Sequence, residues 1–164
     1  MSESPSQTTP SQTIGPFFSF GLEWMAAPDL VDPASPGAIE LVGTVYDGAG
    51  AGVPDAVVEI WQPPLFGRAL TGADGSFRFT TVKPAPGAKG DAPHVDVSLF
   101  ARGLLQRVVT RIYFPDEETA NASDPVLAEV PEDRRATLVA VSKDGCLRFD
   151  LHLQGPRETV FFAY

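Results

Sequence analysis

The sequence contains few of the side chains from which proteins build reactive or metal-binding sites. Its 164 residues include one cysteine, two histidines and three tyrosines. A single cysteine excludes an internal disulfide. Cys146 is followed by the apolar Leu147, which indicates a buried strand position rather than a catalytic thiol with a histidine and cations around it. The sequence therefore predicts too few ligands for this chain to hold a catalytic metal on its own.

Basic residues are also scarce. The chain has 12 Lys and Arg residues against 21 Asp and Glu residues, so its formal net charge is −9. Proteins that bind the nucleic-acid backbone usually present a basic face, and this sequence contains no cluster of Lys and Arg. We therefore expect no nucleic-acid partner.

Long apolar runs are absent as well. No run approaches the roughly 20 apolar residues that a membrane-spanning helix needs. Residues 1–7 contain neither the basic nor the apolar region of a secretory signal. These features predict a cytoplasmic protein with no membrane partner.

Glycine and proline, by contrast, are abundant and scattered. The 15 Gly and 16 Pro residues separate short apolar segments rich in β-branched side chains, a pattern typical of many strands and turns. Strands are predicted at 39–46, 57–62, 70–79 (with a hairpin turn at 73–76), 94–100, 107–114, 136–142, 147–153 and 158–162. The sequence predicts an all-β fold: a β-sandwich of about eight short strands with long connecting loops. At most one or two short helices are expected, one of them at 116–122.

The N-terminal region changes character within a few residues. Residues 1–12 are rich in Ser, Thr, Pro and Gln, and we expect them to form an extended arm. Residues 13–164 are expected to form the folded domain. The first residues of this domain, TIGPFF at 13–18, place large apolar groups around a Gly-Pro turn. A segment this apolar is expected to dock on this chain or on another.

Two histidines are the first candidates for chemistry. His94 and Asp96 stand two residues apart in a predicted strand, so they point to one face and could be two metal ligands. A working site needs at least a third ligand, and the preceding loop offers only Asp91. The favoured interpretation is a half-buried histidine hydrogen-bonded to a carboxylate. His152 alternates with leucines, which predicts a place on the solvent face or at an interface edge.

Two arginines are the next candidates. Arg102 ends an apolar strand at a glycine turn, where a guanidinium can hold a carboxylate with two hydrogen bonds or can be an ordinary surface charge. Arg111 lies within an otherwise apolar strand, so it needs a partner or an outward face.

Several motifs, taken together, resemble one enzyme family. TPSQTIGPFF at 9–18 is similar to the N-terminal signature of the intradiol ring-cleavage dioxygenases. Six further motifs follow in the family's order: GTVYD at 43–47, VEIWQ at 58–62, FGR at 66–68, DGSF at 74–77, TVKP at 81–84 and APHV at 92–95. SLFARG at 98–103 and ETVFF at 158–162 resemble the family's α-type subunit, which does not bind iron.

The resemblance implies an enzyme that opens a carboxylated catechol ring between its two hydroxyl-bearing carbons during the catabolism of aromatic compounds. It implies O₂ and a non-haem Fe(III) held by two Tyr and two His of a partner β subunit. In this chain His94 is kept, Asp96 stands where the second His belongs, and Gly87 stands where one Tyr belongs. PPL at 63–65 replaces the segment that carries the other Tyr. The resemblance therefore implies no catalytic residue and no metal in this chain.

The same resemblance implies what the chain contributes instead. Thr13, Gly15 and Pro16 match residues that line the mouth of the neighbouring β subunit's site, and Phe17 replaces a Tyr found in many relatives. Arg102 matches an arginine that faces the incoming substrate. The alternative is a non-catalytic binding or scaffold module, because the segments 43–47 and 74–79 also resemble small transthyretin-like sandwiches.

Overall fold

The computed structural model describes residues 8–15, 17–87 and 90–163. Nine strands form the body of this part of the chain: β1 (Ala38–Tyr46), β2 (Val57–Gln62), β3 (Leu65–Leu70), β4 (Ser76–Val82), β5 (His94–Phe100), β6 (Val108–Tyr113), β7 (Val141–Lys143), β8 (Cys146–Arg148) and β9 (Leu151–His152). The short helices are α1 (Phe17–Leu22), η1 (Glu23–Met25), α2 (Glu118–Ser123), α3 (Pro125–Glu129), α4 (Glu132–Arg135) and η2 (Ala136–Leu138).

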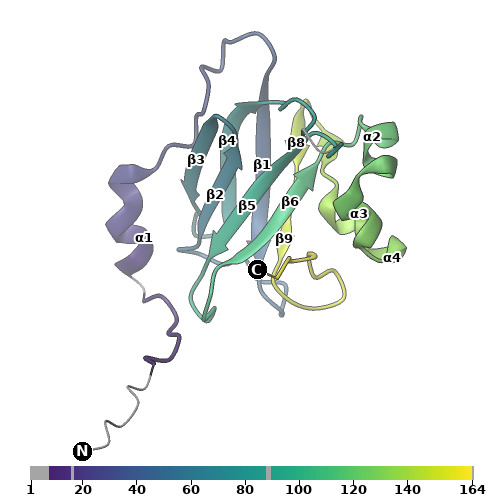
Figure 1. The fold of residues 1–164 in the computed structure, drawn as a ribbon. Helices are drawn as coiled ribbons and strands as arrows, with labels where there is room; N and C mark the ends of the chain where they lie inside the picture. The colour runs from purple at the N-terminus through teal and green to yellow at the C-terminus, as the bar shows by residue number, and fades with distance from the viewer. Residues whose placement is uncertain (1–7, 16, 88–89, 164) are drawn as a thin grey trace, which may run out of the picture.

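The strands form two sheets that pack face to face, so the predicted β-sandwich is confirmed. One sheet has the order β3-β2-β5-β6, and the other has the order β4-β1-β8-β7 with β9 also paired to β1 (Figure 1). Side chains that alternate inward from each sheet form the core between them. The core residues include Leu41, Val45 and Phe79 from one sheet and Ile60, Val97 and Leu99 from the other.

Strand β5 shows how the alternation places the candidate residues. Val95, Val97 and Leu99 are buried in the core, so His94 and Asp96 point to the opposite, outer face of the sheet. The outer face of the β3-β2-β5-β6 sheet therefore carries the two candidate ligand positions.

The short helices are more numerous than the one or two expected. Helices α2, α3 and α4 lie beyond β6 in Figure 1 and are no longer than six residues each. Such short helices show no amphipathic period in the sequence; α3 is instead fixed locally by the Asp124 cap and by Pro125 at its first position. They bury a second, smaller core made of Ala92, Tyr113, Leu127, Val130 and Leu138.

Some predicted elements differ in the structure. The strand expected at 136–142 is the 3-10 helix η2 followed by β7, and the one expected at 158–162 makes a single bridge between Val109 and Phe162. The turn at 73–76 connects β3 to β4, which lie in different sheets, so the hairpin expected there is wrong, and most of β3 lies before the predicted 70–79 segment. No helix within the described ranges has the length and apolar character needed to traverse a bilayer.

Candidate functional site

The N-terminal segment lies against the loop that follows β5. The Thr13 hydroxyl accepts a hydrogen bond of 2.7 Å from the backbone N–H of Gly103, and the Phe18 ring packs 5.6 Å from the Phe100 ring. Gly103 has φ near 90°, a left-handed conformation that suits glycine and lets the chain turn at this point. A small pocket of about 210 Å³ lies between the two segments. The structure therefore brings Thr13 directly against the Arg102 loop, a contact that the sequence does not predict although the family resemblance assigned both residues to one entrance.

Arg102 is held by an acidic neighbour. Its Nε lies 2.9 Å from Oδ2 of Asp55, and just over half of its side chain is exposed. Asp55 lies in the turn before β2 with a left-handed φ of 59°. From this position its carboxylate faces Arg102. Because an exposed ion pair of this kind contributes little to stability, its main effect is to orient the guanidinium. A contact through Nε leaves the two terminal nitrogens to meet another acceptor.

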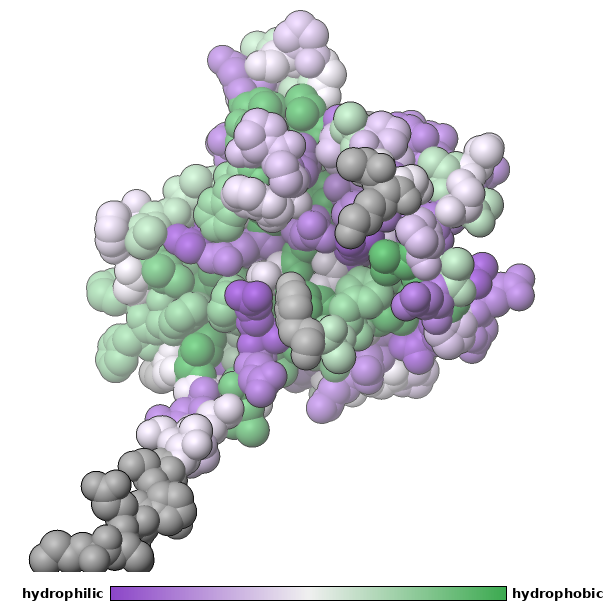
Figure 2. Space-filling model, viewed as in Figure 1, coloured by the Kyte–Doolittle hydropathy of each residue, from purple (hydrophilic) through white to green (hydrophobic). Residues whose placement is uncertain are grey.

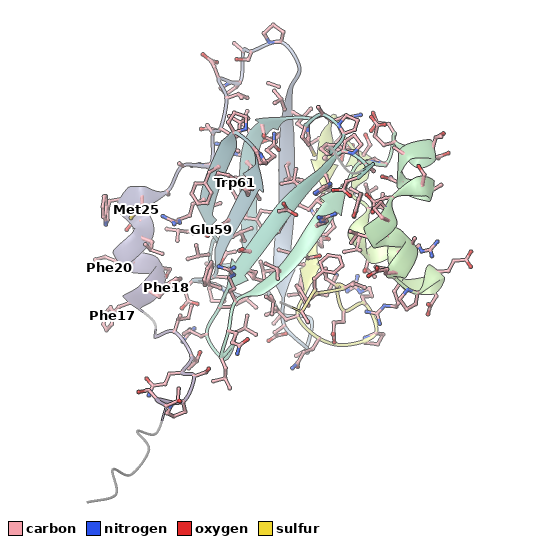
Figure 3. All side chains as sticks on the ribbon, in the orientation of Figure 1. Phe17, Phe18, Phe20, Met25, Glu59 and Trp61 are labelled. Carbon is pink, nitrogen blue, oxygen red and sulfur yellow. The ribbon has the colours of Figure 1, made fainter. Side chains whose placement is uncertain are left out.

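The remaining entrance candidates lie next to an exposed apolar surface. Gly15 is exposed, and a Cβ built on it would meet no atom within 4 Å; Pro16 lies outside the described residues. Phe17 begins α1 and is 80% exposed. Phe20 and Trp24 are also largely exposed, at 71% and 81%. Figure 3 shows Phe17, Phe20 and Met25 pointing away from the sheets, whereas Phe18 lies on the side of the strands. We call Phe17, Phe20, Trp24 and Met25 the α1 apolar surface.

His94 and Asp96 lie side by side on the outer face of β5. His94 Nε2 is 3.6 Å from Asp96 Oδ1, and the Nδ1 of the same ring is 2.8 Å from the carbonyl oxygen of Ala92. Because a carbonyl can only accept, Nδ1 carries the hydrogen. The His94 ring is thus held by the Ala92 carbonyl, whereas its Nε2 faces the Asp96 carboxylate at a distance too long for the hydrogen bond that was predicted.

Arg111 meets the same carboxylate from the neighbouring strand. Asp96 and Arg111 are directly opposite in the β5–β6 ladder, and Arg111 Nε lies 3.2 Å from Asp96 Oδ1. Burial alone lowers the pKa of Arg111, but the hydrogen bond to Tyr113 and the nearby charges of Asp96 and Asp91 raise its pKa overall. Burial raises the pKa of Tyr113 as well, which keeps its phenol protonated. The guanidinium is therefore a permanent cation at this position.

Gly87 is tied to the loop before β5. Its backbone N–H donates to the carbonyl oxygen of Asp91 at 2.9 Å, and a Cβ at Gly87 would lie 2.9 Å from the Asp91 side chain. A side chain that carried a ligand atom here would require this loop to move.

These residues do not fit a catalytic iron. Among the described residues no three His, Cys, Asp or Glu side chains lie close enough together to hold a metal ion. His94 and Asp96 supply two possible metal ligands. Their third neighbour, Arg111, carries only N–H groups and has no lone pair to give to a metal ion. The arrangement can hold a carboxylate and a histidine in place, and it offers a metal ion no complete coordination shell.

A broad concavity of about 640 Å³ adjoins these positions on the outer face of the β3-β2-β5-β6 sheet. Trp61 lies opposite Phe66 and beside Asp96 in the ladder, with the Trp61 and Phe66 rings 6.0 Å apart. Arg68 pairs with Glu59 one row away. Figure 3 places Glu59 and Trp61 along β2, and Figure 2 shows hydrophilic and hydrophobic residues intermixed on this side. Sequence reasoning missed this second row, although the alternation in VEIWQ already placed Glu59 and Trp61 on one face.

His152 was expected on a solvent face or an interface edge, and that prediction is wrong. Its residue is 9% exposed, and its ring stacks on Tyr46 with centroids 4.9 Å apart. Burial lowers its pKa, and the nearby charge of Arg157 lowers the pKa further. The turn after β9 folds back over it, since the Thr159 hydroxyl accepts from the His152 backbone N–H.

The chain is similar in sequence to two curated dioxygenase subunits along nearly its whole length. It is 41% identical to the protocatechuate 3,4-dioxygenase alpha chain of Burkholderia cepacia, over 94% of this chain and 96% of that one. It is 40% identical to the alpha chain of Pseudomonas putida, over 95% and 96%. The beta chain of Burkholderia cepacia is 32% identical over 62% of this chain and 54% of its own length. No protein-family model matches the sequence.

Solved structures of dioxygenases have the same fold at low sequence identity. The dioxygenase domain of a carbohydrate-binding fusion protein from a Streptomyces species superposes with a TM-score of 0.64 at 24% identity, covering 82% of this chain and 89% of that one. Catechol 1,2-dioxygenase from an Acinetobacter species gives a TM-score of 0.58 at 19% identity, covering 80% and 62%. At these identities the likeness supports the sandwich fold alone.

Proposed function

The chain belongs to the family of protocatechuate 3,4-dioxygenase alpha chains, and on that premise we propose that it is the subunit that completes such an enzyme without binding its iron. The enzyme cleaves protocatechuate with O₂ to 3-carboxy-cis,cis-muconate, a step of the β-ketoadipate pathway. One observation most directly supports the proposal that this chain does not bind the iron. Where a metal would need further ligands beside His94 and Asp96, this chain places the Arg111 guanidinium.

The proposed partner is a related β subunit that holds the Fe(III). A beta chain from the same group of enzymes is 32% identical to part of this chain, which supports descent of the two subunits from one sandwich. When bound in the partner, the iron would supply the means to bring catecholate and O₂ together. This chain supplies no ligand to it in the proposal.

The proposed contribution of this chain is the entrance to the partner's site. Thr13, Gly15, Pro16 and Phe17 would line the mouth, and the hydrogen bond from Gly103 to Thr13 fixes this segment beside Arg102. Protocatechuate carries a carboxylate, so a cation at the mouth attracts and orients it. Asp55 holds Arg102 through Nε, which keeps the terminal nitrogens of the guanidinium for that carboxylate.

The proposed assembly also gives the α1 apolar surface a role. Exposed aromatic rings gathered on one short helical segment are characteristic of a surface that a partner covers. The proposal keeps the expected division into an extended arm at 1–12, of which residues 1–7 lie outside the described part of the chain, and a sandwich at 13–164, and it places the enzyme in the cytoplasm.

Purification with and without the partner tests the proposal. The chain alone should be colourless and inactive, and the co-purified pair should contain iron, show the absorption of tyrosinate bound to Fe(III), and cleave protocatechuate. Ring cleavage or iron-dependent colour from this chain alone would contradict the assignment of roles. Failure to co-purify with any β-type subunit would contradict the assembly itself.

A further inference from the structure

The former ligand positions belong to a ring of side-chain and backbone contacts that closes on itself. Its inner half is buried. His94 Nδ1 donates to the Ala92 carbonyl at 2.8 Å, and the Ala92 N–H donates to Asp124 Oδ2 at 2.8 Å. The Tyr113 hydroxyl donates to the other oxygen of Asp124 at 3.0 Å. Asp124 is fully buried, so this half of the ring fixes the loop before β5 to helix α3.

The outer half of the ring depends on Arg111. Its Nη1 donates to the Tyr113 hydroxyl at 3.4 Å, and its Nε lies 3.2 Å from Asp96 Oδ1. The same Asp96 oxygen is 3.6 Å from His94 Nε2, which returns the ring to its start. These contacts link six residues from β5, β6, the loop before β5 and the N-cap of α3.

Arg111 carries the one permanent positive charge of these six residues. A metal ion bound here would have to take a lone pair from His94 and one from Asp96. Arg111 already forms an ion pair with the Asp96 oxygen that faces His94, it has no lone pair of its own, and its charge repels a second cation. The Glu59–Arg68 pair one row away is a similar cross-strand ion pair, but no histidine belongs to it.

We propose that Arg111 replaces the lost metal: its guanidinium neutralises Asp96, closes the ring, and excludes divalent cations from His94 and Asp96. The proposal rests on the proposed function only in treating these positions as former ligands. It predicts that a restored histidine at 96 is not enough to restore metal binding. The arginine has to be removed as well.

A nickel titration of the full chain tests the exclusion. The variants are Asp96→His, Arg111→Gln and the double change Asp96→His/Arg111→Gln, with Glu59→His/Arg68→Gln as the matched control pair. Two histidines on one strand face form a chelating pair for Ni²⁺. Calorimetry should show that the double variant binds Ni²⁺ at least tenfold more tightly than Asp96→His. The Glu59→His/Arg68→Gln control should show no such gain over Asp96→His. Adding Arg111→Lys to Asp96→His should keep nickel out, because the charge remains.

Two results would overturn the exclusion. One is equal nickel affinity of Asp96→His and the double variant. The other is nickel binding by the unmodified chain that disappears in His94→Asn. Such binding would contradict the proposal, in which Arg111 excludes divalent cations from His94. The second result needs no variant at position 96 or 111, so it remains decisive if those variants do not fold.

A thermal unfolding cycle tests the charge replacement separately. Arg111→Gln and Asp96→Asn should each lower the melting temperature, and the double variant should lose clearly less than the sum of the two. Additive losses would show that the two side chains are not coupled and would overturn the proposed charge replacement.

Neither the nickel titration nor the unfolding cycle uses activity or the partner subunit. A failure here would leave the subunit assignment intact, and a catalytically active isolated chain would refute the assignment without bearing on Arg111.

Discussion

The Thr13 hydroxyl accepts a hydrogen bond of 2.7 Å from the Gly103 backbone N–H, across 90 residues of sequence. This bond fixes the N-terminal segment beside the loop that carries Arg102. Because both groups are exposed, a change at Thr13 can test the proposed entrance without disturbing the folding of the sandwich.

Thr13→Val should loosen the entrance without unfolding the domain. Loss of one exposed neutral hydrogen bond costs about 0.5–1 kcal/mol, which corresponds to roughly a two- to fivefold rise in KM for protocatechuate if the segment lines the mouth. Steady-state kinetics of the co-purified enzyme measure this. Thr9→Val, in the part of the chain before the contact, is the control. An unchanged KM in Thr13→Val would remove the segment from the entrance.

Arg102→Ala should weaken substrate capture in a salt-dependent manner. Loss of a cation at the mouth should lower kcat/KM by about three- to tenfold at low ionic strength, with the difference shrinking as salt screens the charge. Asp55→Asn should have a smaller effect of the same kind, because it releases the guanidinium without removing it. Arg78→Ala removes a different exposed ion pair and is the control. A salt-independent loss would point to a structural role.

Trp24→Ser and Phe20→Ser should weaken assembly with the β subunit. Both side chains are largely exposed in the isolated chain, so their loss should leave its melting temperature unchanged. If they are buried at the centre of an interface, each should cost about 2 kcal/mol of binding, or roughly a thirtyfold rise in Kd. Sedimentation of mixed subunits gives the Kd. Val141→Ser, at an exposed position on β7, serves as the control.

Asp124→Ala should destabilise the isolated chain strongly. The buried carboxylate accepts hydrogen bonds from the N–H groups of Ala92, Val126 and Leu127 and from the Tyr113 hydroxyl. Loss of a helix cap together with buried partners should lower the free energy of unfolding by about 2–4 kcal/mol. Urea denaturation measures the change. Asp133→Ala, on the exposed side of α4, should change it little.

His152 should make stability depend on pH. Its pKa is lowered in the folded state by burial and then by Arg157, so the folded chain binds fewer protons than the unfolded chain below neutral pH. The stability linked to this ring is complete above its ordinary pKa of about 6.5 and is lost as the pH falls through the lowered folded value. The difference between the free energies of unfolding at pH 5.5 and at pH 7.5 should be smaller in His152→Gln than in the unmodified chain. An unchanged difference would assign the effect to other groups.

The sequence predicted strand β5 and its two faces well, because a period of two needs only local information. His94 and Asp96 therefore lie where alternation placed them. The pairing of Asp96 with Arg111 depends on the register between strands, which no local pattern contains. The buried state of His152 was missed for a similar reason: β9 is only two residues long, and the turn that covers it comes from the residues that follow.

Helix α1 and the α1 apolar surface were also missed as structure. Sequence reasoning recognised the segment 13–18 as apolar and expected it to dock, but six residues carry no readable helical period. The resemblance to dioxygenases brought Thr13 and Arg102 into one hypothesis before the fold did. The transthyretin-like alternative gains no support from relatives that match the chain from end to end.

If these positions once held a metal, as proposed, the pairing of Asp96 with Arg111 would make that loss difficult to reverse in evolution. A single mutation that restores a histidine at 96 would leave a half-buried cation without its carboxylate, and a single mutation at 111 would leave the carboxylate without its cation. Each single change is therefore expected to cost stability that only the second change could recover. Under the proposed function, the ion pair would keep a subunit that has lost its metal ligands dependent on a partner that retains them.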